Sequence, residues 1–202
     1  MRVALFGGTF DPIHNGHLAV ATAAAHTFAL DQVIFAPAGR QPLKPEHPSA
    51  SFPDRLAMTA LACDSDPRFS ASTIDAPRPD GAPNYTVDAL ITLRQRFPAA
   101  TLFVIVGADS FLSLRRWHQP DRLLELAEWI VVSRPGFPLE DQSALASLAL
   151  TPTQLARVHL LLTLHEDVSS TRLRERLHHG DPCTDLLAPA VSAYIQDHRL
   201  YR

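Results

Sequence analysis

Short apolar runs alternate along the chain with longer stretches in which apolar residues recur at helical spacing. The runs rich in apolar or β-branched residues predict strands at residues 3–6, 33–36, 69–74, 101–106, 129–133 and 158–162. The stretches between them predict helices at residues 18–30, 53–63, 87–97, 122–127, about 170–179 and 189–197, with a short helix that ends over 112–117. Strands that alternate with helices are typical of an α/β fold. We therefore predict a Rossmann-like parallel sheet with helices on both faces.

Several of these helices begin with residue types that cap helices. Ser51, Thr86 and Asp121 stand just before the helical stretches at 53–63, 87–97 and 122–127. A side-chain oxygen at such a position can accept a hydrogen bond from the first turn, so we predict these three residues as caps.

The run Thr101–Val106, TLFVIV, is the most strand-like of the chain. Its continuous apolar character predicts a central parallel strand covered on both faces. Gly107 and Asp109 follow at its carboxyl end, where ligands bind in open α/β sheets. Asp109 is a candidate to hold a ribose hydroxyl or a magnesium-bound water, and it could equally cap the short helix that follows.

Residues 2–18, RVALFGGTFDPIHNGHL, form the most distinctive stretch. A strand, two glycines and an Asp-Pro turn lead to HNGH at the start of a helix. Gly7 and Gly8 allow close approach to a ligand, and the N–H groups of a helix start suit phosphate. The glycines match neither the GxGxxG fingerprint nor a P-loop. His14 and His17 are three residues apart, so both rings are candidates to donate hydrogen bonds to phosphate oxygens.

Zinc binding is the competing chemistry for the two histidines. The chain contains no HExxH or CxxC string, and its two cysteines, Cys63 and Cys183, lie far apart in sequence. We therefore expect no metal site built by the protein.

Composition limits the class of protein. With 202 residues, of which 46% are hydrophobic, the chain suits a single domain over residues 1–202. A net charge of −3 gives no bulk attraction to nucleic acid or to an anionic membrane. Because we find neither a signal segment nor an 18-residue apolar span, we expect a cytoplasmic protein.

A second polar string, SSTRLR, occupies residues 169–174. Ser169 or Ser170 can cap the helix there, and Arg174 falls in its predicted first turn, where a cation opposes the helix dipole. That placement becomes favourable if an anion binds at the same end, because a guanidinium is a two-pronged donor to phosphate.

The HNGH string resembles the HxGH motif of the nucleotidylyltransferase superfamily, and GGTFDPIHNGHL is similar to its nicotinate mononucleotide adenylyltransferase family. SSTRLR resembles the ISSTxIR motif of that family. Weaker resemblances lie between the two, in QPLKP at residues 41–45, in NYTVDA at 84–89, and in GADSF followed by Trp117. The chain departs from the family at Leu43, where a histidine is usual beside Lys44, and at Ala89, where threonine is usual.

The resemblance implies a nucleotidylyltransferase-type fold and a reaction. The adenylyl group of ATP passes to nicotinate mononucleotide, giving deamido-NAD and pyrophosphate, a step in NAD biosynthesis. The mononucleotide phosphate attacks directly, and Mg²⁺ enters bound to the phosphates of ATP. Residues 137–156 are assigned no chemistry, and a homo-oligomer is left open.

The resemblance also implies the site residues. The expected catalytic residues are His14, His17, Lys44 and Arg174. The expected ATP-binding residues are Gly7, Gly8, Thr9, Phe10, His14, His17, Gly107, Asp109, Ser170, Thr171 and Arg174. The expected mononucleotide-binding residues are Lys44, Tyr85, Thr86, Trp117 and Arg134, with the Trp117 indole stacked on the pyridine ring.

Three other functions compete with this one. A pantetheine-phosphate adenylyltransferase usually has threonine in place of His14, and a cytidylyltransferase would carry a second motif different from SSTRLR. A non-catalytic nucleotide sensor would not need His14, His17 and Arg174 together. A pyrophosphate-release assay with ATP and a panel of mononucleotides separates all three from the expected enzyme.

Overall fold

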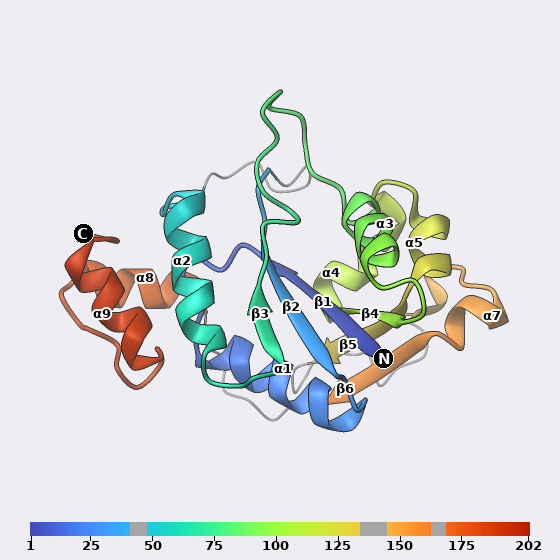
Figure 1. Cartoon of the computed structure of the whole chain (residues 1–202), viewed down its shortest axis with the longest axis horizontal. Coiled ribbons are helices and arrows are strands. Elements are labelled where there is room, and N and C mark those ends of the chain that lie inside the picture. The colour runs from blue at the N-terminus through green and yellow to red at the C-terminus, as the bar shows by residue number, and fades with distance from the viewer. Residues whose placement is uncertain (41–47, 134–144, 163–168) are drawn as a thin grey trace. The chain divides into compact units, whose positions relative to one another are not determined.

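The computed structural model describes residues 1–40, 48–133, 145–162 and 169–202 (Figure 1). The strands are β1 (Arg2–Gly8), β2 (Gln32–Pro37), β3 (Phe69–Ala71), β4 (Thr101–Gly107), β5 (Glu128–Ser133) and β6 (Val158–Leu162). The helices are α1 (Asn15–Thr27), α2 (Phe52–Cys63), α3 (Thr86–Arg96), α4 (Ala108–Leu112), the 3-10 helix η1 (Leu114–Arg116), α5 (Pro120–Leu126), α7 (Pro152–Leu155), α8 (Ser170–His178) and α9 (Pro189–Asp197).

The six strands form one sheet in the order β3-β2-β1-β4-β5-β6. β1 pairs in parallel with β4, with Phe6 opposite Ile105. β4 also pairs in parallel with β5, and β5 pairs in parallel with β6. The order reverses between β1 and β4, which is the doubly wound pattern of Rossmann-like folds. The predicted α/β class with a parallel sheet is confirmed.

The chain divides into two compact units. The first contains residues 1–7, 20–33 and 85–165, and the second contains residues 8–19, 34–84 and 166–202. The single domain expected over residues 1–202 therefore stays a prediction.

The first unit is built around β4, whose residues from Leu102 to Val106 are all buried. Arg94 on α3 donates to the carbonyl oxygens of Ala100 at 2.6 Å and Leu126 at 3.2 Å, which fastens α3 to the starts of β4 and β5. Trp129 of β5 is fully buried and packs against Phe111 of α4, with ring centroids 5.5 Å apart. Large aromatic side chains thus fix the segment that follows β4.

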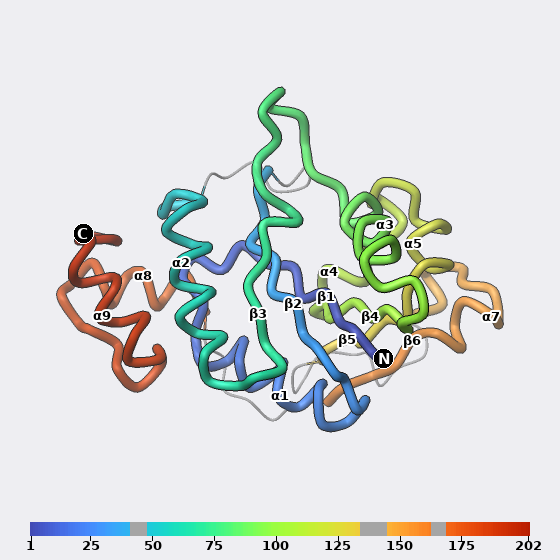
Figure 2. Tube along the Cα trace, in the orientation of Figure 1, coloured from blue at the N-terminus to red at the C-terminus, as the bar shows by residue number. Residues whose placement is uncertain are grey.

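The second unit is built around α2, which packs against α9 and β3 (Figure 2). Ser51 caps α2 as predicted, because its hydroxyl accepts from the Asp54 N–H at 3.3 Å, and Pro53 stands in the first turn. The Tyr194 hydroxyl of α9 donates to the Asp54 carboxylate at 3.0 Å. The C-terminal helix is thereby tied to the start of α2.

Other predicted boundaries differ from the structure for local reasons. α1 begins at Asn15 rather than residue 18 and ends at Thr27 rather than residue 30. It ends early because Ala29, two residues later, has a left-handed φ of 46°. β3 stops at Ala71 rather than residue 74, because a turn follows in which Ala76 donates to the Thr73 carbonyl oxygen at 2.9 Å.

Two predicted caps are wrong. Tyr85, not Thr86, is the residue before α3, and its carbonyl oxygen accepts the first helical bond, from Asp88 at 3.0 Å. Gln119 precedes α5, and Asp121 instead accepts a hydrogen bond from Arg115 Nη1 at 2.7 Å. In both cases a side chain of the capping type stands one or two positions inside the helix.

Candidate active site

The loop between β1 and α1 is organised by a buried carboxylate. Asp11 is 3% exposed and accepts hydrogen bonds from the N–H groups of Ser49 at 2.7 Å and Ala50 at 3.1 Å. The Tyr201 hydroxyl donates to the same carboxylate at 2.7 Å. Three donors from two distant segments therefore hold the loop that carries the HNGH string.

A buried arginine supports the same loop. Arg55 of α2 is 2% exposed and donates to the carbonyl oxygens of Thr9 at 2.6 Å and Ala38 at 2.8 Å. Burial lowers its pKa, and the nearby Asp11, Tyr201 and Asp75 oppose that change. Because it bonds carbonyls that follow both β1 and β2, Arg55 fixes the chain at the ends of two strands.

Burial affects the pKa of Asp75 more than the charge of the neighbouring Arg55 does. Desolvation raises the pKa of its carboxyl to about 7, and the Arg55 guanidinium only partly offsets this. Gly39 packs directly on this segment: a Cβ there would lie 2.7 Å from the Asp75 carbonyl oxygen. The loop after β2 therefore requires glycine at this position.

The two glycines at the end of β1 have different roles. A Cβ on Gly7 would meet no atom within 4 Å, so its backbone can be approached closely. A Cβ on Gly8 would lie 2.9 Å from the ring of Phe10, so Gly8 makes room for that side chain. Phe10 is buried, with a left-handed φ of 48°, and packs on Phe35. Phe10 therefore supports the loop.

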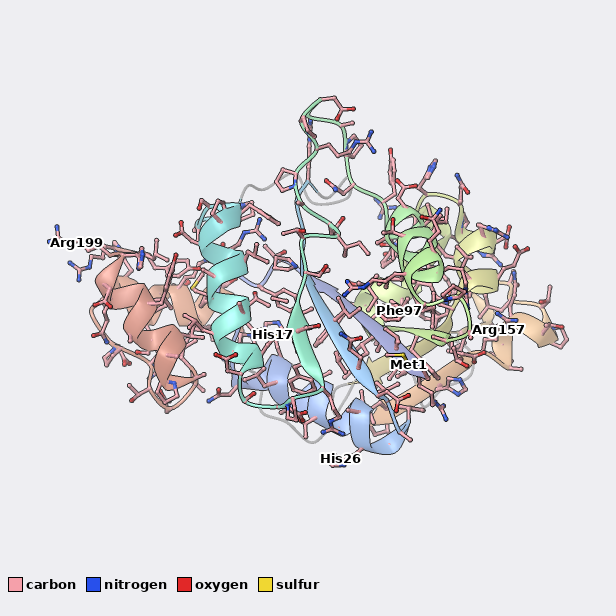
Figure 3. All side chains as sticks on the ribbon, viewed as in Figure 1. Met1, His17, His26, Phe97, Arg157 and Arg199 are labelled. Atoms are coloured by element: carbon pink, nitrogen blue, oxygen red, sulfur yellow. The ribbon has the colours of Figure 1, made fainter. Side chains whose placement is uncertain are left out.

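His14 and His17 stack on each other. Their ring centroids are 3.8 Å apart with an interplanar angle of 28°, and His17 lies at the start of α1 (Figure 3). The backbone N–H of His14 donates to His17 Nδ1 at 3.3 Å. That hydrogen bond places the proton of the neutral His17 ring on Nε2, which makes Nε2–H a donor. The two rings therefore lie together, and their role as donors to phosphate oxygens stays a prediction.

The backbone at the start of α1 is already partly engaged. The Asn15 N–H donates to the Leu186 carbonyl oxygen at 2.8 Å, and the Asn15 amide to that of Asp185 at 3.3 Å. Arg176 fixes this C-terminal loop through Asp181 and Asp185, at 2.8 and 3.0 Å. The loop 181–186 thus braces the HNGH string, and fewer helix N–H groups remain for a ligand than the sequence suggested.

Arg174 joins the second motif to the first. Its Nη1 donates to the Asp11 carbonyl oxygen at 2.9 Å, and its Nη2 lies 3.4 Å from Thr171 Oγ1. Arg174 is the fifth residue of α8, so its predicted place in the first turn is wrong. Side chains of a helix lean toward its N-terminus, which lets a residue of the second turn reach back to that end.

The start of α8 offers further donors. Ser169 precedes the helix but makes no capping bond with its side chain, and Leu173 donates to its carbonyl oxygen at 2.9 Å. Ser170 and Thr171 form the first turn, and Thr171 is exposed. A helix start with hydroxyl groups and an arginine is suited to an anion.

In the other unit, Gly107 and Asp109 lie at the carboxyl end of β4, as predicted. Gly107 precedes α4, so Asp109 is not its cap. The Asp109 carboxylate is exposed and lies over Gly107, where a Cβ would come within 2.8 Å of Oδ1. The geometry leaves this carboxylate available to a ligand.

Two aromatic residues predicted for the mononucleotide belong to the same unit. The Trp117 indole N–H donates to Ser113 Oγ at 3.1 Å, and its ring packs edge-on against Trp129 at 6.0 Å. Tyr85 stacks on His118, with ring centroids 4.2 Å apart. Thr86 is the first residue of α3. Lys44 and Arg134 lie outside the described residues.

Three residues that support the HNGH loop, Arg55, Asp11 and Tyr201, were not predicted from the sequence. Arg55 gave a signal, as a lone cation in the apolar stretch FPDRLAMTALAC. Asp11 stood inside the recognised string, but its partners are 38 to 190 residues away. Nothing in the sequence pointed to Tyr201.

In residues 1–40, 48–133, 145–162 and 169–202, no cluster of three or more His, Cys, Asp and Glu side chains could hold a metal ion. Within the same residues, none of the helices has the length and apolar character needed to cross a membrane.

Residues 5–176 match the family described as Cytidylyltransferase-like. The chain is 42% identical over 202 residues to a Thermus thermophilus protein named "Probable nicotinate-nucleotide adenylyltransferase", covering 100% of both chains. It is 41% identical over 200 residues to a Herpetosiphon aurantiacus protein of the same name, covering 99% of this chain and 98% of that one. The chain belongs to the nicotinate-nucleotide adenylyltransferase family. The predicted family and nucleotidyltransferase class are confirmed.

Solved structures agree on the fold. Nicotinic acid mononucleotide adenylyltransferase of Plasmodium falciparum, complexed with NaAD, superposes with a TM-score of 0.75 at 18% identity, covering 99% of this chain and 97% of that one. The complex of the same enzyme with APC gives a TM-score of 0.75 at 19% identity, covering 99% and 96%. Both superpositions support the Rossmann-like fold described above.

Proposed function

We propose that this member of the nicotinate-nucleotide adenylyltransferase family transfers the adenylyl group of ATP to nicotinate mononucleotide, giving deamido-NAD and pyrophosphate in NAD biosynthesis. The hydrogen bond from Arg174 to the Asp11 carbonyl oxygen, at 2.9 Å, is the observation that carries this proposal. It ties the HNGH string and the SSTRLR string, from opposite ends of the chain, into one phosphate-binding group.

The chemistry asks for charge neutralisation and alignment. The mononucleotide phosphate attacks the α-phosphorus of ATP in line, and pyrophosphate leaves, so no protein nucleophile is required. His17 Nε2–H and the His14 ring donate to phosphate oxygens as negative charge shifts in the transition state. Arg174 stabilises the departing pyrophosphate with its two-pronged guanidinium.

The remaining phosphate contacts come from backbone and hydroxyl groups. Gly7, whose missing Cβ leaves open space, lets the backbone approach the nucleotide. Ser170 and Thr171 bind the triphosphate at the start of α8. Gly8, Thr9 and Phe10 shape the loop, and Lys44 is proposed as a further phosphate donor.

Further residues are proposed for the nucleosides. Trp117 stacks on the pyridine ring, held in place by Ser113 and Trp129. Tyr85, Thr86 and Arg134 are proposed for the mononucleotide. Gly107 and Asp109 serve ATP, with the Asp109 carboxylate accepting from a ribose hydroxyl or from a magnesium-bound water.

Magnesium fits this chain as an ion carried by ATP. Among the described residues there is no cluster of ligands for a metal, whereas Mg²⁺ binds readily through phosphates while keeping several waters. The exposed Asp109 carboxylate is the group proposed to contact its water shell. When bound, the ion neutralises phosphate charge, and the residues named above do the positioning.

Pyrophosphate release tests the proposal. The purified chain is mixed with ATP, Mg²⁺ and one acceptor: nicotinate mononucleotide, nicotinamide mononucleotide or phosphopantetheine. A separate reaction replaces ATP by CTP and supplies an acceptor of a cytidylyltransferase. We expect release with nicotinate mononucleotide and a product of the mass of deamido-NAD. Release with phosphopantetheine alone, or with none of the acceptors, would contradict it.

A further inference from the structure

The Asp11 carboxylate lies beside Arg174 but does not form a close ion pair with it. Arg174 Nη1 is 2.9 Å from the Asp11 main-chain oxygen and 4.0 Å from Asp11 Oδ2. A buried carboxylate normally draws a guanidinium into a short, bidentate pair. The Arg174 side chain is 29% exposed, so part of the guanidinium still faces solvent. Other contacts of the Asp11 carboxylate therefore prevent a short ion pair with Arg174.

Three other donors occupy that carboxylate. Oδ2 accepts from the Ser49 N–H at 2.7 Å, and Oδ1 accepts from the Ala50 N–H at 3.1 Å and from the Tyr201 hydroxyl at 2.7 Å. Two of the three are backbone groups. The Tyr201 hydroxyl is the one side-chain donor among them, and it comes from the second-last residue of the chain.

The backbone at Tyr201 shows that this contact is held at a cost. Tyr201 has a left-handed φ of 62°, and Arg199 has one of 53°. Non-glycine residues rarely adopt this conformation, least of all bulky ones. Arg199 lies at the C-terminal end of α9, where the Leu200 N–H donates to the Ile195 carbonyl oxygen at 3.0 Å and the Arg199 N–H to that of Gln196 at 3.2 Å, the pattern in which a left-handed residue ends a helix. Tyr201 follows this end, and its hydroxyl bond to Asp11 holds it in its own left-handed conformation. Burial and the Asp11 carboxylate raise the pKa of Tyr201, which keeps the hydroxyl protonated as a donor.

We propose that Tyr201 is a positioning residue for Arg174. By donating to Asp11 Oδ1, it keeps the carboxylate satisfied where it lies, with Oδ2 4.0 Å from Arg174 Nη1, so that the guanidinium stays available to the triphosphate of ATP. This inference rests on the proposed function, in which Arg174 binds ATP. Without the hydroxyl, the carboxylate turns toward Arg174 and withdraws it from the anion.

The matched variants are Tyr201→Phe and Tyr194→Phe. Each loses a tyrosine hydroxyl that donates to a carboxylate of the same unit, but Tyr194 donates to Asp54 and not to Asp11. Affinity for ATP is measured by calorimetric titration, steady-state kinetics follow both substrates, and thermal melting checks the fold. We expect Tyr201→Phe to weaken ATP about 10-fold with an unchanged KM for the mononucleotide, and Tyr194→Phe to leave both unchanged.

The same pair is then made in an Arg174→Ala background. If Tyr201 acts through Arg174, Tyr201→Phe causes no further loss of ATP affinity there. An equal 10-fold loss in both backgrounds, or a loss no larger than that of Tyr194→Phe, would overturn the inference. A Tyr201→Phe variant that weakens both substrates and melts at a much lower temperature would also overturn it, because that result indicates a structural role.

These outcomes are separate from those that test the function. Binding of ATP without any transfer to nicotinate mononucleotide would contradict the proposed function, while the titrations would still decide the role of Tyr201. A wild-type chain that does not bind ATP would overturn both.

Discussion

Arg174 and Asp11 are 163 residues apart in the sequence and are joined by a hydrogen bond of 2.9 Å from the guanidinium to a main-chain oxygen. This bond fixes the start of α8 against the loop that follows β1. The two strings that resemble family motifs thereby become one group of donors.

Arg174→Lys should impair the use of ATP by about 10- to 100-fold in kcat/KM. The planar guanidinium of arginine can donate to the Asp11 carbonyl oxygen and to a phosphate at the same time. Lysine keeps the charge but lacks this two-pronged geometry. Steady-state kinetics with varied ATP measure the effect, and Arg172→Lys, at an exposed residue of the same helix, is the control. Unchanged ATP kinetics would reassign Arg174 to a structural role.

Arg55→Met should destabilise the fold by about 2–4 kcal/mol, because the buried carbonyl oxygen of Ala38 and the partly buried one of Thr9 lose their donor. Urea unfolding gives the free energy. The control is Arg68→Met, since Arg68 pairs with Asp66 near the surface and its loss should change stability little. A similar free energy of unfolding for both variants would show that the buried guanidinium contributes nothing particular.

Asp75 should make stability depend on pH. Its pKa in the folded state is about 7, above the usual value near 3.8, so the folded state holds the proton more tightly than the unfolded state. The stabilisation is complete below about pH 4 and is lost as the pH rises to about 7. Asp75→Asn should therefore gain on the order of 2–4 kcal/mol over the wild type at pH 8 and little at pH 4.

Urea unfolding of both proteins at several pH values between 4 and 8 measures this difference. Asp80→Asn is the control, because Asp80 is exposed and its pKa lies below the usual value, held there by Arg78. If the wild type and Asp75→Asn changed in parallel with pH, the carboxyl of Asp75 would not titrate as described.

Trp117→Ala should weaken the mononucleotide by about 5- to 150-fold and leave ATP nearly unaffected. The pyridine of the mononucleotide is positively charged, so an indole face offers cation–π attraction as well as stacking. The packing of Trp117 on Trp129 implies that Trp117→Ala also melts at a lower temperature, and Trp117→Phe should keep part of both properties. Titration of each substrate alone decides: equal losses for the two would indicate packing only.

Features encoded by neighbouring residues could be predicted from the sequence. The strands and most helices follow from apolar spacing, and α9 has the predicted bounds of Pro189–Asp197. The HNGH and SSTRLR strings led to the candidate side chains His14, His17 and Arg174, whose roles stay predictions. The positions of Thr86 and Asp121 show the limit of this reasoning, because a capping residue type does not fix the residue at which a helix starts.

Contacts between distant segments could not be predicted. Tyr201 meets Asp11 across 190 residues, and Asn15 meets Asp185 across 170. Neither spacing has a period or a motif, since such contacts depend on how the units fold rather than on local sequence. The spacing of His14 and His17 predicted that the two rings point to the same side of the helix start. It did not predict that they stack, because spacing alone does not distinguish stacked rings from separate ones.

The central claim is that the HNGH histidines stabilise the transition state of adenylyl transfer. The most direct measurement is turnover of ATP and nicotinate mononucleotide by His17→Ala, together with its affinity for ATP and its melting temperature. The account predicts a fall in kcat of about 100-fold or more, with ATP affinity and melting temperature close to those of the wild type. Near wild-type turnover in a variant that binds ATP normally would contradict it.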